Sequence, residues 1–108
     1  MGGKVEYMTK KNRYKNDFRR SKKTRGHPAY IYKREGDTYK FVSLTHAPIT
    51  RGVKNIPLDK NPNPNDTSKS YVRPYKYSDN IKNFSRKLMG WKLGSSDRVK
   101  INKIKKGK

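Results

Sequence analysis

Positive charge is the feature that most constrains this chain: 29 Lys and Arg against 8 Asp and Glu give a formal net charge of +21 over 108 residues. Solubility requires far less charge than this. A polyanionic partner is implied, and the candidates are nucleic acid, an anionic membrane surface and an acidic protein. A membrane would require a long apolar span or a basic amphipathic helix with bulky apolar residues, and neither is clear. We expect binding to nucleic acid and no membrane association.

Composition sets the size and the character of the core. Hydrophobic residues make up 30% of the chain, but 8 Tyr, 3 Phe and 1 Trp supply bulky core material. The length suits a single domain. There is no cysteine, so no disulfide or thiolate site can form, and the first residues lack the apolar segment of a secretory signal. We expect one compact cytoplasmic domain with frayed ends.

Residues 1–27 are predicted to form a basic arm or long loop. Nine Lys and Arg against one acid lie between Thr9 and Arg25, which favours an arm that orders on nucleic acid. The alternative is a solvated leader without a specific role. Residues 105–108 are predicted to be a disordered basic tail.

The strongest local pattern is a β-hairpin. The segments 28–33 and 38–44 are rich in aromatic and β-branched residues. Gly36 lies in the short connection between them, where a tight turn needs a positive φ. Two further short strands are predicted at 53–58 and 70–74, and the Asn- and Pro-rich run between them is predicted to be a surface loop.

A helix is predicted near 79–89, because Ile81, Phe84 and Leu88 follow helical spacing. Trp91 and Leu93 are expected to cover the edge of the core, while the pattern around Ile101 and Ile104 fits a strand or a helix equally well. Several short strands and one helix predict a mainly β domain (α+β) over 28–104, built as a small barrel or sandwich.

Three motifs in this order resemble the PemK/MazF-type toxin endoribonucleases: Pro28–Tyr32 is similar to the first of two strands bracketing their active site, Ala47–Thr50 to the second motif and Ser70–Pro74 to a later strand. Residues 3–7 are similar to the family's opening strand. The resemblance implies an SH3-like β-barrel with a helix, RNA cleavage, a homodimer and an antitoxin protein as partner. One departure is that the family arginine directly precedes the proline, whereas this chain has His27 there.

The resemblance implies a catalytic set of His27, Arg25 and Thr50. Metal-independent RNA hydrolysis needs a base for the 2′-OH proton, an acid for the leaving oxygen and a cation for the phosphorane charge. His27 would act as acid or base, Arg25 or Arg51 would hold the phosphate, and Thr50 would donate a hydrogen bond. Alternatively, these are ordinary strand-end and surface residues. Two well-separated histidines and few carboxylates make no ligand set, so we expect no metal and no cofactor.

Nucleic-acid contacts are predicted for basic and aromatic side chains of the arm, the hairpin and the motifs. Tyrosines that alternate along one strand face could stack unpaired bases, or they could form the core with Ala29 and Ile31 outside. The predicted binding residues are Arg19, Arg20, Lys22, Lys23, Tyr30, Tyr32, Lys33, Arg34, Lys40, His46, Arg51 and Arg73.

Two functional hypotheses remain at this point. The first is a PemK/MazF-like RNA-binding module, either an active endoribonuclease or a relative that kept binding and lost cleavage. The second is a non-enzymatic nucleic-acid-binding protein, such as a ribosome-associated or accessory factor. RNA is favoured over DNA, because a duplex-DNA binder would need a recognition helix or apolar wedges, and the helix predicted near 79–89 is needed to cover the core.

Overall fold

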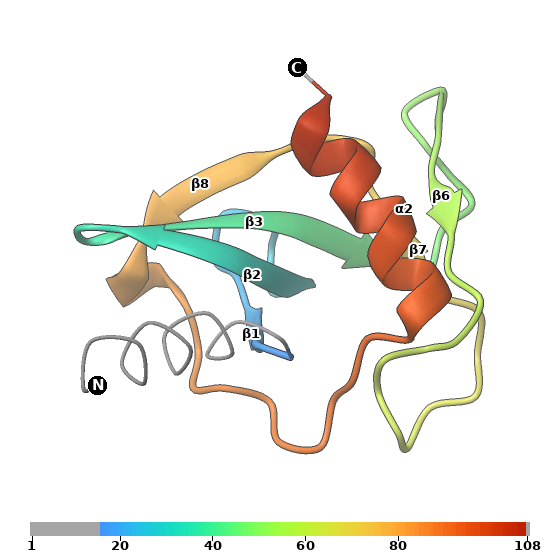
Figure 1. The fold of residues 1–108 in the computed structure, drawn as a ribbon, viewed down its shortest axis with the longest axis horizontal. Helices are drawn as coiled ribbons and strands as arrows, with labels where there is room; N and C mark the ends of the chain where they lie inside the picture. Colours follow the sequence, from blue (N-terminus) through green and yellow to red (C-terminus); the bar gives the residue numbers. More distant parts are fainter. Residues whose placement is uncertain (1–15, 108) are drawn as a thin grey trace, which may run out of the picture.

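The protein is mainly β, with a bent sheet that one α-helix crosses on one face (Figure 1). The computed structural model describes residues 16–107. Within this range the sheet does not close into a barrel, because its path ends at β1 on one side and β6 on the other. The path is β1 (Phe18–Arg20), β2 (Pro28–Glu35), β3 (Thr38–Thr45), β7 (Tyr71–Val72) and β6 (Ile56–Pro57). The other elements are β8 (Tyr77–Asn80), which pairs with β3, the hairpin β4 (Ile49–Thr50) and β5 (Val53–Lys54), the 3₁₀ turn η1 (Ile81–Asn83) and α2 (Ser95–Lys106).

The predicted hairpin of β2 and β3 is confirmed and forms the centre of the sheet. Its strands pair antiparallel from Ala29↔Ser43 to Glu35↔Thr38, with a bulge between Ile31 and Lys33. The other edge of β3 is divided between two partners: its first half pairs with β8 and its last two residues pair with β7. Strand β3 therefore holds together segments that are far apart in the sequence.

The central strands are covered on both faces. Tyr30 and Val42 belong to a cluster that α2 covers with Ile101 and Ile104. Ile31 and Phe41 belong to a second cluster, against which Tyr77, Ile81 and Phe84 pack. Because successive strand residues point to opposite faces, β2 contributes side chains to both clusters. The sequence left two interpretations open: either the tyrosines are exposed for base stacking, or they form the core with Ala29 and Ile31 outside. Both are incomplete, because Ala29, Tyr30 and Ile31 are all buried.

The helix predicted near 79–89 is wrong. Residues 77–80 are extended because their backbone pairs with the first half of β3, and η1 gives only one 3₁₀ turn before Phe84 returns to extended geometry. Ile81 and Phe84 pack on the second cluster, whereas Leu88 packs on the first. Three residues at helical spacing therefore serve two different cores and do not share one helix face.

The only α-helix of the described residues is α2, which resolves the ambiguity around Ile101 and Ile104. Both side chains are buried, and the intervening polar residues face outward. The helix is anchored by Asp97, whose carboxylate is 0% exposed and accepts hydrogen bonds from the backbone N–H groups of Asp59 (2.7 Å) and Lys60 (3.2 Å). Within the described residues, no helix is long and apolar enough to span a membrane.

The predicted ends of the domain need correction. Phe18 is fully buried in β1, and Asn16 Oδ1 accepts a hydrogen bond from Leu93 N–H at 3.0 Å. Residues 16–27 thus belong to the fold, because the backbone of β1 pairs with β2 and Phe18, the aromatic residue of this basic run, is buried in the core. Lys105 and Lys106 complete the last turn of α2 and do not form a disordered tail. The strand expected at residues 3–7 lies outside the described residues.

Candidate nucleic-acid interface

Two Thr-Arg-Gly turns, residues 24–26 and 50–52, have the same backbone signature. Arg25 and Gly26 have φ of 58° and 84°, and Arg51 and Gly52 have φ of 50° and 80°. Positive φ at both central residues is the requirement of a type I′ turn. The first turn closes between His27 N–H and the Thr24 carbonyl (3.1 Å) and the second connects β4 to β5.

Both arginines occupy conformations that are costly for a residue with a Cβ. A left-handed backbone destabilises such a residue by roughly 1 to 2 kcal/mol, and Asn or Gly usually takes the place. The side chains of Arg25 and Arg51 make no hydrogen bond or ion pair with any described residue. The fold therefore presents two unneutralised guanidinium groups at a cost in stability, which is typical of functional sites.

The two turns flank one pocket of about 340 Å³, called here the central pocket. It brings together Arg25, His27 and Thr50, which the resemblance had grouped as a catalytic set. None of the described residues that line it is acidic. His27 is exposed, and its ring makes no hydrogen bond within the described chain. The lining residues are Lys23, Thr24, Arg25, His27, Ser43, Leu44, Thr45, Thr50, Arg51, Arg73 and Tyr77.

A buried amide orders one wall of the central pocket. Asn55 Nδ2 donates to Thr50 Oγ1 (2.8 Å) and to the Ala47 carbonyl (2.9 Å), while its Oδ1 accepts from the Arg73 guanidinium (2.9 Å). Arg73 also lies over the Tyr75 ring at 5.1 Å. Sequence reasoning missed Asn55, because an asparagine before a short strand has no signal that distinguishes it from a turn residue.

A second basic hollow of about 300 Å³ adjoins the central pocket and shares Tyr77 with it. Among the predicted residues, Tyr32, Lys33 and Lys40 lie here. The two lysines pair with Glu35, at 2.9 and 3.2 Å. Hydrogen bonds from these two ammonium groups lower the pKa of the Glu35 carboxyl. The lining residues are Tyr32, Lys33, Lys40, Lys76, Tyr77, Ser78 and Lys105.

Tyr30 does not provide a stacking surface for bases, and that prediction is wrong. It is 5% exposed, and its hydroxyl accepts a hydrogen bond from Arg98 at 3.1 Å. Burial raises its pKa. Tyr32 is half-buried under the Lys105 ammonium, which lies 5.2 Å from the ring centre. The physical reason is that α2 covers this face of β2, which alternation along the strand could not reveal.

The other predicted basic residues are divided between the pockets and remote positions. Arg20 is exposed and donates to the Gly26 carbonyl at 3.1 Å, which supports the first Thr-Arg-Gly turn. Lys23 lines the central pocket and Lys22 precedes it in the same exposed loop. Arg19 pairs with Asp17 at 2.8 Å, and Arg34 donates to Gly36 at the tip of the β2–β3 hairpin, away from the pockets.

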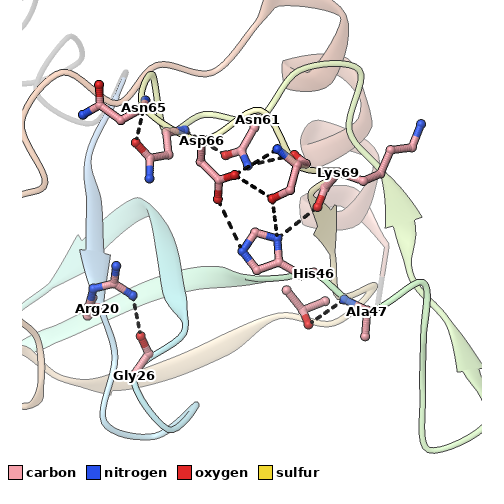
Figure 2. A network of polar contacts seen from close by, with 11 residues as sticks. Arg20, Gly26, His46, Ala47, Asn61, Asn65, Asp66 and Lys69 are labelled. Carbon is pink, nitrogen blue, oxygen red and sulfur yellow. Dashed lines mark hydrogen bonds and ion pairs between the residues drawn. The ribbon is translucent and has the colours of Figure 1, made fainter.

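His46 lies in a polar network at the mouth of a third hollow (Figure 2). Its Nδ1 is 3.0 Å from the Lys69 carbonyl and its Nε2 is 3.6 Å from the Asp66 carboxylate. Hydrogen bonds from the hydroxyl and the backbone N–H of Ser68 lower the pKa of the Asp66 carboxyl. This network fastens the loop of residues 59–70 to the end of β3.

No family model, curated protein or solved structure matches this chain. The resemblance therefore rests on the three motifs themselves, which the structure places at the start of β2, in β4 and in β7. Across residues 16–107, no group of three or more His, Cys, Asp or Glu is placed to hold a metal ion.

Proposed function

We propose that the protein binds single-stranded RNA along the basic hollows and cleaves it in the central pocket without a metal, in the manner of PemK/MazF-like endoribonucleases. One observation carries the proposal: the central pocket gathers Arg25, His27, Thr50, Arg51 and Arg73 with no acid among its described lining residues. Such a cluster attracts a phosphodiester and repels none of its charge.

The residues of the pocket match the needs of the reaction. His27 exchanges the proton of the attacking 2′-OH or of the leaving 5′-oxygen, a role that histidine takes more often than any other side chain. The guanidinium groups of Arg25 and Arg51 stabilise the charge that develops on the phosphorane. Because Asn55 donates to Thr50 Oγ1, the hydroxyl hydrogen of Thr50 is left to donate to a phosphate oxygen.

The proposal extends to the fold and the partners implied by the resemblance. We infer a partly open SH3-like barrel, supported by the way β3 shares one edge between β7 and β8. The same resemblance supports a cytoplasmic homodimer with an antitoxin protein as its partner. An acidic antitoxin segment would neutralise part of the +21 charge.

Purified protein in EDTA is expected to cleave a long single-stranded RNA, and His27→Ala is expected to slow cleavage by about 100-fold or more, since a positioned acid or base contributes 10²–10⁴-fold. Thr50→Ala should slow it less, because it removes one hydrogen bond. Gel electrophoresis of the RNA over time measures both. Intact RNA despite tight binding would exclude cleavage and leave RNA binding in place.

A second candidate function is RNA binding without cleavage, and one observation favours it. The His27 ring has no orienting partner among residues 16–107, whereas catalytic imidazoles are usually fixed by a second hydrogen bond. His27 also stands where the family has arginine. The cleavage assay separates the two candidates.

RNA affinity is expected to fall steeply with salt, with a slope of log K against log[salt] of roughly −2 to −4, because each phosphate contact on a single strand contributes about −0.7. Fluorescence anisotropy of labelled RNA between about 50 and 200 mM salt measures the slope. A flat response would contradict binding through phosphates.

A further inference from the structure

The third hollow, called here the outer pocket, adjoins the central pocket and encloses about 290 Å³. The two pockets share Arg25, His27, Leu44 and Thr45 in their walls. The rest of the outer pocket comes from Trp91, from the loop of residues 59–70, and from Arg20, Gly26, Pro28 and His46. Its volume is at the lower end of small-molecule sites, which suits one planar ring system better than a longer stretch of chain.

The chemistry of the outer pocket differs from that of the central pocket. Trp91, Leu44 and Pro28 give it apolar surface, and Asn63 and Ser70 give it polar groups. Ser70 is 4% exposed as a residue, but its hydroxyl oxygen is not fully buried and makes no hydrogen bond to any described residue. Asn63 Oδ1 accepts from the Asn65 backbone N–H at 3.0 Å, and the Asn63 NH₂ group makes no hydrogen bond to any described residue. A ring with polar edges satisfies both kinds of group.

The outer pocket differs from the central pocket by one carboxylate in its lining. The Asp66 carboxylate lines it, and hydrogen bonds from Ser68 lower the pKa of this carboxyl. The Arg20 guanidinium also lines the outer pocket and donates to the Gly26 carbonyl, with its charge retained. The central pocket, which has no acid in its described lining, therefore suits an anion better than the outer pocket does. The outer pocket has the apolar surface that an uncharged ring requires. The contacts of His46 with Lys69 and Asp66 hold the loop over the outer pocket before any ligand arrives (Figure 2).

We propose that the outer pocket binds the nucleobase of a nucleotide whose phosphate lies in the central pocket, an inference that rests on the proposed RNA binding. Phosphate contacts position a nucleic acid, whereas contacts to its bases confer selectivity. The polar edge of the base meets Ser70 and Asn63, and its face lies against the apolar wall that contains Trp91. The outer pocket makes this protein selective for unpaired bases.

The single tryptophan of the chain makes the proposal directly measurable. The full chain is titrated with single-stranded RNA of about 12 nucleotides, with 2′-O-methyl groups that prevent hydrolysis, and with an oligomer of the same length whose sugars carry no bases. We expect the first ligand to change Trp91 emission in parallel with binding measured by anisotropy, and the base-free oligomer to bind without this change. Equal emission changes, or RNA binding without any change, would overturn the base pocket alone. Failure of both oligomers to bind would overturn the proposed function with it.

A pair of buried serines provides the matched variants, since Ser70 lines the outer pocket and Ser43 lines the central one. Ser70→Ala is expected to reduce the affinity ratio between the base-containing and base-free oligomers by about threefold to tenfold, the effect of one neutral hydrogen bond. Ser43→Ala should leave that ratio unchanged. An unchanged ratio in Ser70→Ala, or an equal loss in both variants, would contradict base recognition in the outer pocket.

Discussion

Replacing Arg25 and Arg51 together with asparagine is expected to weaken RNA binding by about 100-fold, because each arginine offers a charge-assisted contact to phosphate. The same change is expected to raise the free energy of unfolding by roughly 1 to 2 kcal/mol. Asparagine tolerates the positive φ that both residues adopt and forms the Asn-Gly pair that type I′ turns favour. Anisotropy with labelled RNA and urea unfolding measure the two effects.

The matched control removes the same charge elsewhere. Arg86 and Lys87 are exposed and line none of the pockets described above, so replacing both with asparagine should lower RNA affinity only slightly, through the net charge. The informative result is that the turn variant loses RNA affinity while its free energy of unfolding rises. A turn variant that loses stability, or that binds RNA as tightly as the control, would contradict a functional role for the strained arginines.

Asp97→Ala is expected to lower the free energy of unfolding by about 3 kcal/mol, the loss of hydrogen bonds to a buried charged group. The carboxylate accepts from the backbone of Asp59 and Lys60 and lies 3.5 Å from the Lys100 ammonium. Alanine leaves two backbone N–H groups without an acceptor and detaches the start of α2 from the loop that follows β6. Urea denaturation followed by circular dichroism measures the change.

Asp59→Ala serves as the control, because Asp59 pairs with the same lysine at 3.0 Å but its side chain is 60% exposed. Solvent screens exposed pairs, so this variant should be far less destabilised than Asp97→Ala. Equal losses in the two variants would show that the exposed contacts of Asp59 with Lys100 and Ser96, and not the buried backbone contacts, anchor the helix.

Local patterns predicted the β2–β3 hairpin well and the helix badly, for one physical reason. The strand predicted at 53–58 is divided into β5, which pairs with β4, and β6, which pairs with β7. The β2–β3 hairpin depends on residues adjacent in sequence and on Gly36, so its signal is local. The spacing of Ile81, Phe84 and Leu88 is also local, but pairing with β3 holds residues 77–80 extended and directs the three side chains to two separate clusters. Hydrogen bonds across the sheet keep this backbone extended, although the spacing of its apolar residues favours a helix.

The candidate site was predictable in its residue types but not in its geometry. Histidine, arginine and threonine in two short stretches pointed to phosphate chemistry, and the sheet brings those stretches to one pocket. The role of Asn55, which orders Thr50 and Arg73, could not be predicted, because it exists only once β4, β5 and β7 have assembled.

The charge of +21, the absence of cysteine and the mainly β character follow from the sequence by itself, because they depend on composition and on neighbouring residues. The tertiary structure decided which charges remain unpaired and which aromatic rings are buried. Tyr30 illustrates the difference: alternation puts it on one face of β2, but only the packing of α2 covers that face. In the folded chain, part of the positive charge from which we inferred a nucleic-acid partner lies in two arginine turns with positive φ, beside a pocket without an acid in its described lining. Only the structure shows this, because burial and pairing are long-range properties of the folded chain.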